Sequence, residues 1–374
     1  MTARGTYRLK FIVFATILAC IIKAAMAESH STQTASSDHF FDEIQQLAQN
    51  GNISAQRKLG LMYLTGQAVE SNLDRARHWL ERAASKNDIE AQKSFGKIYA
   101  EGLGVKIDLS KSIEFFKLAA GQGDAIAEAF LGQAYEKGFG VEVNYSSAAR
   151  WYNRAAEKGN ANGQFGLGGL YYRGFGTVQN FVEAFRFYQK AALKGHPDAN
   201  YMIAVMFEKG QGVEENIKKA EDWYGKAANL DIPEAAFQLA QRIQNGDGLF
   251  QSTERAAEWF LHAAKRGHVA SQIALAEIYS NPEGLLFEEA DATKWYVEAA
   301  NNDVATAQLE AGLRYQQGLG TKQDLKESAK YLKLAALNDI TLAKFLYGEQ
   351  LLTGAGVERN ETEAAKYIID AAHA

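Results

Sequence analysis

The sequence of 374 residues contains one cysteine, Cys20, and three prolines. A single cysteine cannot close a disulfide within the chain. So few prolines, together with 11% aromatic residues, exclude a largely disordered protein. Acidic residues outnumber Lys and Arg by 45 to 40, which argues against binding along a nucleic-acid backbone. The sequence therefore predicts a folded, acidic chain that is not held by disulfides.

The first 27 residues have a different character from the rest. They carry basic but no acidic residues, an apolar run at 11–22, and the small residues Ala25 and Ala27 around Met26. The run is too short for a membrane span of about 20 residues. It predicts an export signal over 1–27 that is removed before Glu28, and hence a periplasmic or secreted protein. Two alternatives stay open, a retained anchor and a lipoprotein that is modified at Cys20.

The rest of the chain repeats itself every 36 residues. From Gly51 to Ala374 there are nine such periods without an insertion. A fixed period of this length is typical of stacked helical repeats. The clearest marker is an alanine pair, which begins at residues 83, 119, 155, 191, 227, 263, 299, 335 and 371. We predict an all-α fold, an α/α superhelical solenoid of nine helix–turn–helix repeats, numbered 1 to 9 from Gly51.

Each period has the pattern of two amphipathic helices around a glycine turn. Ala55, Leu59 and Tyr63 give the apolar stripe of a first helix, and Gly102 and Gly104 give the turn of the next repeat. The second helix is expected to begin after a side chain that can cap it. The predicted caps are Asn72, Asp108, Asn144, Asn180, Asn216, Ser252, Asp324 and Asn360, and only Glu288 departs from the pattern.

Two further features are assigned to packing. An aromatic residue recurs in the second helix of every repeat, from Trp79 to Tyr367, and we expect these rings to lie in the core against small alanines. Gly163, Gly166 and Gly168 resemble a nucleotide-binding loop, but no strand precedes them, so they indicate close helix packing. Residues 28–50 are expected to form a flexible segment and a capping helix that starts near Ser37.

The repeated pattern resembles the Sel-one-like repeat (SLR) family, a relative of the tetratricopeptide repeat. The matching order is an alanine, Leu-Gly, Tyr, Gly-x-Gly-Val, an Asn or Asp, an aromatic pair and Ala-Ala, and it is clearest over 91–123 and 127–159. The resemblance implies curved superhelices that act as adaptors in complexes, in signalling and in bacterial secretion, envelope regulation or host contact. Repeats 5 to 7 depart from the pattern, with alanine in place of the first-helix glycine and Pro282 in place of a turn glycine.

No pattern of catalysis or of metal binding is present. The seven histidines lack partners at metal-ligand spacing, and no nucleophile elbow or Cys–His pair occurs. We therefore expect no enzyme activity, no cofactor, no metal and no small-molecule substrate. Two alternatives stay open, the first from the resemblance and the second from the N-terminal segment. One is an enzyme like the β-lactam-hydrolysing members, although their cysteine pairs are missing here. The other is a membrane-anchored assembly factor.

The leading hypothesis is an exported scaffold that binds a protein partner along the concave face that first helices would line. One first-helix column changes along the chain from basic (Arg57 and Lys93) to apolar, and the loops of repeats 6 and 7 are unusually apolar. An exposed apolar patch often marks a partner site, whereas a buried one fills local space. The predicted partner-binding residues are Phe165, Tyr201, Phe237, Phe250, Leu286 and Phe287.

Overall fold

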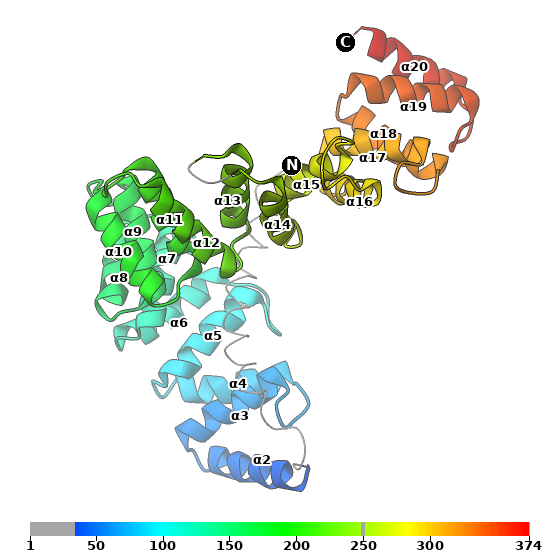
Figure 1. Cartoon of the computed structure of the whole chain (residues 1–374). Coiled ribbons are helices and arrows are strands. Elements are labelled where there is room, and N and C mark those ends of the chain that lie inside the picture. Colours follow the sequence, from blue (N-terminus) through cyan, green and yellow to red (C-terminus); the bar gives the residue numbers. More distant parts are fainter. Residues whose placement is uncertain (1–33, 248–250, 374) are drawn as a thin grey trace. The chain divides into compact units, whose positions relative to one another are not determined.

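The computed structural model describes residues 34–247 and 251–373, which fall into two compact units, one up to Asn144 and one from Tyr145. The predicted export signal lies outside these residues. All the regular elements that the described residues form are helices (Figure 1). The first unit contains α2 (Thr34–Gln49), α3 (Ile53–Thr65), α4 (Leu73–Ala84), α5 (Ile89–Glu101), α6 (Leu109–Gly121) and α7 (Ala125–Lys137).

The second unit continues the same alternation of first and second helices. Within each unit, every helix packs against the helices before and after it in the chain. Its helices are α8 (Tyr145–Glu157), α9 (Ala161–Arg173), α10 (Phe181–Leu193), α11 (Pro197–Lys209), α12 (Ile217–Asn229), α13 (Pro233–Asn245), α14 (Thr253–Ala264), α15 (Val269–Ser280), α16 (Glu289–Ala300), α17 (Ala305–Gln317), α18 (Leu325–Leu337), α19 (Thr341–Thr353) and α20 (Glu361–Ala372). The predicted all-α repeat fold is confirmed.

The helix boundaries follow the predicted capping chemistry. Seven of the predicted second-helix caps accept a hydrogen bond from a backbone amide at the helix start: Asn72, Asp108, Asn180, Asn216, Ser252, Asp324 and Asn360. Glu288 makes no such side-chain bond. The helix that precedes the repeats, α2, begins at Thr34, ahead of the predicted start near Ser37.

The turn glycines fix how neighbouring repeats dock. In repeats 5, 8 and 9, a Cβ on Gly212, Gly320 or Gly356 would lie 2.0–2.3 Å from a carbonyl oxygen at the start of the preceding second helix. All three residues also have positive φ. Only glycine allows both this backbone and this approach without strain.

The core rings are not those that the sequence suggested. The fully packed column is one residue further along the second helix and includes Tyr188 and Tyr224, each at most 2% exposed. In the predicted column only Trp295 and Tyr331 are buried, and the other rings lie partly exposed. Phe187 stacks on Tyr171 with ring centres 5.8 Å apart, so these outer rings pack on rings rather than only on alanines.

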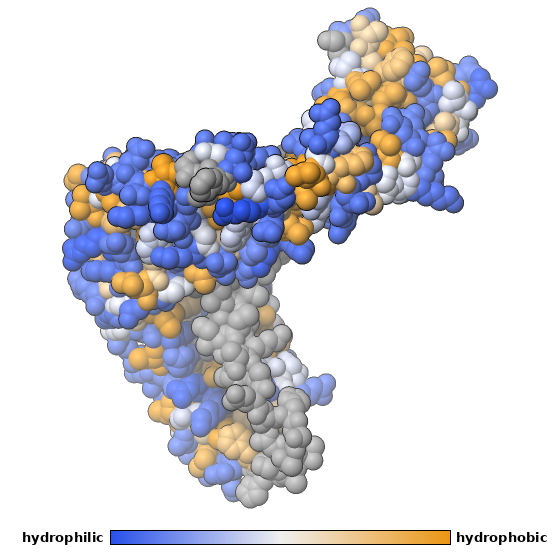
Figure 2. All heavy atoms as spheres, viewed as in Figure 1, coloured by the Kyte–Doolittle hydropathy of each residue, from blue (hydrophilic) through white to orange (hydrophobic). Residues whose placement is uncertain are grey.

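The predicted packing role of the repeat 4 glycines is confirmed. Gly163, Gly166 and Gly168 are buried in α9, and a Cβ on Gly166 would lie 2.4 Å from the ring of Tyr152. The hydrophobic residues that remain on the surface lie among hydrophilic ones on the face shown in Figure 2.

Candidate functional site

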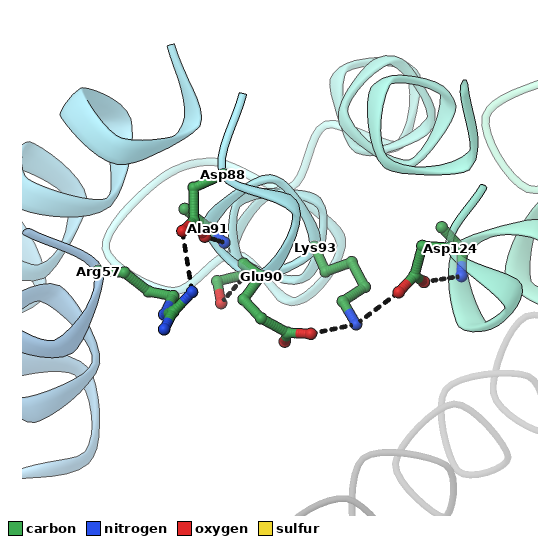
Figure 3. A network of polar contacts seen from close by, with 8 residues as sticks. Arg57, Asp88, Glu90, Ala91, Lys93 and Asp124 are labelled. Carbon is green, nitrogen blue, oxygen red and sulfur yellow. Dashed lines mark hydrogen bonds and ion pairs between the residues drawn. The ribbon is translucent and has the colours of Figure 1, made fainter. Parts of the chain in front are cut away.

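The variable first-helix column has a structural task in the first unit, because its cations bind the next repeat. Asp88 accepts a bond from the amide of Ala91 through Oδ1, and its Oδ2 lies 2.9 Å from the Arg57 guanidinium (Figure 3). Asp124 caps α7 in the same way, and its other oxygen lies 3.0 Å from Nζ of Lys93. One carboxylate therefore both starts a helix and ties two repeats together.

At two junctions of the second unit, pairs of rings occupy the two positions that hold these ion pairs in the first unit. Phe165 stacks on His196, 31 residues later, with ring centres 4.2 Å apart, and Phe237 lies 4.7 Å from His268. Tyr201 packs on Tyr224 of its own repeat. Phe165, Tyr201 and Phe237 are thus half-buried against the core, and only the outer part of each ring is accessible. Their role in partner binding stays a prediction.

The loop between α15 and α16 departs from the other turns. The residue after α15, Asn281, has an extended backbone (φ −77°, ψ 108°), where most first helices end on a left-handed glycine. Pro282 follows it, and the residue before a proline is driven toward extended conformations. Gly284 consequently meets atoms of Asn281 rather than the preceding repeat, so the usual docking contact is missing.

A groove opens where this contact is missing. It measures about 270 Å³, and its large apolar lining residues are Ile278, Leu285 and Leu286. Leu285 is 90% exposed and Phe287 43% exposed, whereas Leu286 is half-buried and packs against the core. We call this feature the repeat 7 groove. It is lined by Gln244, Thr253, Glu254, Glu277, Ile278, Asn281, Gly284, Leu285 and Leu286.

The sequence-predicted residues are only partly brought together here. Leu286 lines the groove and Phe287 follows it in the same loop. Phe250 lies outside the described residues. The rings of Phe165 and Tyr201 belong to the first helices α9 and α11 and do not line the groove.

Two acidic side chains, Glu254 and Glu277, line the groove. Repeat 7 (residues 267–302) has six acidic residues and one basic residue, Lys294. Glu254 and Glu277 line the groove and are exposed, and Glu283 is exposed in the loop between α15 and α16. Hydrogen bonds from its own backbone amide and from the Ser252 hydroxyl lower the pKa of Glu254, so this carboxylate stays charged. The sequence analysis did not predict these acidic side chains beside the groove, although the excess of acidic residues in repeat 7, which includes Glu277, was a visible signal.

The described residues offer little for chemistry on a bound metal. Within 34–247 and 251–373, no group of three or more His, Cys, Asp or Glu residues could hold a metal ion. Nor is any helix in that part of the chain both long and apolar enough to cross a membrane. The groove does offer apolar and acidic lining residues, a combination that suits an apolar or basic side chain of a peptide.

Comparisons with known proteins agree with the repeat period. The family model described as Sel1 repeat matches nine segments: 53–88, 89–124, 125–160, 161–196, 197–232, 233–268, 269–304, 305–339 and 341–374. No curated protein matches the chain.

Two solved structures resemble most of the chain. One is a protective antigen present in uropathogenic Escherichia coli strains that displays an SLR fold; it is 28% identical, with 91% of this chain and 81% of that chain covered, and a TM-score of 0.61. The other is a Sel1 repeat protein from Oxalobacter formigenes, 24% identical over 88% of this chain and 99% of that one, with a TM-score of 0.60. The second likeness concerns the fold alone.

Proposed function

The chain belongs to the Sel1 repeat family, and on this premise we propose that it is a non-catalytic scaffold that binds a protein partner. The observation that carries the proposal is the repeat 7 groove. Leu285 is a large apolar side chain that is left 90% exposed beside a groove, which is unfavourable unless something covers it. Burying such a side chain in a complex is worth about 1.5–3 kcal/mol.

The charge around the groove specifies the partner's chemistry. A lining that combines Ile278, Leu285 and Leu286 with the carboxylates of Glu254 and Glu277 suits an apolar side chain flanked by Lys or Arg. Complementary charge speeds association and rejects wrong partners more than it adds affinity. We therefore assign to the groove a partner segment that is apolar and basic.

We place this scaffold outside the cytoplasm. Support comes from the predicted signal at 1–27 and from the likeness to a protective antigen of uropathogenic Escherichia coli. The intact mass of the protein made in its own host tests the location, because cleavage after Ala27 leaves Glu28 as the first residue. An uncleaved chain without modification would count against export, whereas a lipid-modified Cys20 at the N-terminus would contradict cleavage after Ala27 and indicate an exported lipoprotein.

The partner chemistry is tested by selecting binders from a displayed library of random peptides. We expect selected peptides to place Lys or Arg next to an apolar residue, and Leu285→Asp and Glu277→Lys to abolish their binding. Both side chains are exposed, so the melting temperature should hardly change. Leu337→Asp, at a leucine that is 63% exposed in α18, serves as the matched control and should bind normally.

Partners captured from the host should respond in the same way. A captured protein that is lost with Leu285→Asp and kept with Leu337→Asp would be assigned to the groove. Binding that survives both Leu285→Asp and Glu277→Lys would remove the groove as the site.

A further inference from the structure

A second apolar surface lies on repeat 4, and its charge is opposite to that of the groove. Val178 is 87% exposed and Val182 62% exposed, and Arg186 lies one turn after Val182 on α10. The neighbouring repeats carry Glu142 and Glu214 at the position of Val178. We call Val178, Val182, Arg186 and Lys190 the repeat 4 ridge.

The ridge carries two basic residues, Arg186 and Lys190, and the groove is lined by two acidic residues, Glu254 and Glu277. The repeats that hold the ridge and most of the groove have charge excesses of the same opposite signs. Repeat 4 (159–194) has four basic residues and one acidic residue, Glu183, whereas repeat 7 has six acidic residues and one basic residue. Arg186 pairs with Glu183 but is 59% exposed, so its guanidinium stays accessible to a second carboxylate.

Ridge and groove of the same chain are held apart by the fold. Repeats 5 and 6, which comprise α11 to α14, separate α10 from α15 in the stack of the second unit. Each helix of this unit packs on its neighbours in the chain, so α10 meets α9 and α11 rather than α15. A ridge that enters the groove must therefore come from another molecule.

We propose that the repeat 4 ridge of one copy docks in the repeat 7 groove of a second copy. In this contact Val178 and Val182 cover the exposed Leu285 and the accessible part of Leu286, and Arg186 faces Glu254 and Glu277. A basic partner would match the charge of the groove only, and an acidic partner would match the charge of the ridge only. A second copy of the chain offers a surface that matches each of them. The contact joins two different surfaces, so self-association can continue beyond a dimer as concentration rises.

This inference rests on the proposed function, because the second copy occupies the groove that is assigned to the partner. The two occupants then compete, and self-association keeps the groove covered until a partner with higher affinity is present. Salt weakens the contact, since charges near the surface are screened over roughly 8–10 Å at physiological ionic strength.

The test is sedimentation velocity of the purified chain over a wide concentration range. The average mass of the wild type should rise with concentration and fall when salt is raised. Arg186→Glu and Glu277→Arg each oppose like charges across the contact, so each should weaken self-association by roughly tenfold or more. Arg150→Glu, an equal charge reversal at an exposed arginine of α8, is the control and should leave the mass curve close to that of the wild type.

An equimolar mixture of the Arg186→Glu and Glu277→Arg variants tests directly whether these two residues face each other. The Arg186→Glu ridge matches the Glu277→Arg groove, and the two unchanged surfaces match each other, so mixing the weakened variants should restore the larger species. Both positions are exposed, and circular dichroism checks that the variants fold.

Three outcomes would overturn the proposal: a wild type that stays monomeric at every concentration, no recovery on mixing, or an equal loss with Arg150→Glu. A monomeric wild type whose peptide binding still depends on Leu285 would reject self-association and leave the proposed function standing. Self-association together with peptide binding that is unchanged by Leu285→Asp would support the contact between copies and reject the groove as the partner site.

Discussion

At the junctions between repeats, a single side chain can both cap a helix and bind the neighbouring repeat. Asp88 and Asp124 each serve as a helix cap and as an ionic partner in the first unit. At two junctions of the second unit a phenylalanine and a histidine hold the same two positions, as with Phe165 and His196. The histidine contact brings a dependence on pH that the carboxylate contacts do not have near neutrality.

His196 should make the protein less stable in mild acid. Burial lowers the pKa of His196, with Asp198 opposing the shift, and its Nδ1 has no hydrogen-bond partner among the described residues. The unfolded chain then binds the proton more readily, so stability is full above the unfolded pKa of about 6.5 and falls as pH drops below it. Urea unfolding at pH 7.5 and 5.5 should show a larger loss for the wild type than for His196→Asn. Equal losses in the two proteins would contradict this.

Among the structural elements, the loops add a close backbone contact between repeats to the packing of their helices. In repeat 9 the backbone of Gly356 lies directly over the carbonyl oxygen of Leu325. Repeat 7 shows the effect of losing this docking, because its loop turns away at Pro282 and leaves the groove open. The loop that lacks the docking contact therefore also lines the candidate site.

Gly356→Ala should destabilise the protein more than Gly159→Ala. Both glycines have nearly the same positive φ, 77° and 78°, so the left-handed backbone costs each alanine about 1–2 kcal/mol. A Cβ at Gly356 would also lie 2.0 Å from the Leu325 oxygen, whereas a Cβ at Gly159 meets nothing within 4 Å. Relieving that clash should cost roughly a further 1–3 kcal/mol. Thermal unfolding measures the difference, and equal shifts in melting temperature would show that the loop can move freely.

For the molecule as a whole, stability is expected to be local along the chain. Within each unit the contacts join neighbouring helices, so each repeat depends on the repeats beside it. A defect should then spread over a short stretch of sequence, and local opening rather than global unfolding should report it.

Tyr224→Ala tests this locality. Tyr224 is 1% exposed and donates a hydrogen bond to Glu208, so truncation should cost about 3–5 kcal/mol. Hydrogen exchange should show lost protection in repeats 5 and 6 and nearly normal protection in repeats 1 and 9. Trp223→Ala, at a partly exposed ring under Lys226, is the control and should have a smaller effect. Uniform loss over all repeats would show that the array unfolds as one unit.

The class and the register of this fold are encoded locally and can be predicted from the amino-acid order. A period that never changes length repeats the same apolar stripes, caps and turn glycines, and each of these acts within a few residues of its own position. This is why the caps at Asn72 and Asp324 and the packing of Gly166 could be predicted before the structure was known. The drift of repeats 5 to 7, with Pro282 and Glu288, lies in the part of the chain that contains the candidate groove, whose role in binding stays a prediction.

Contacts between repeats emerge only in three dimensions, because they depend on which side chains 20 to 36 positions apart come to face each other. The sequence pattern could not show that Arg57 binds Asp88, or that Tyr224 rather than Trp223 fills the core, since neighbouring positions on a helix differ by only about 100°. The groove depends on the same long-range fit. Leu285 and Leu286 are adjacent and equally apolar, yet one is left in solvent and the other packs against the core, because the loop after Pro282 turns away from the preceding repeat.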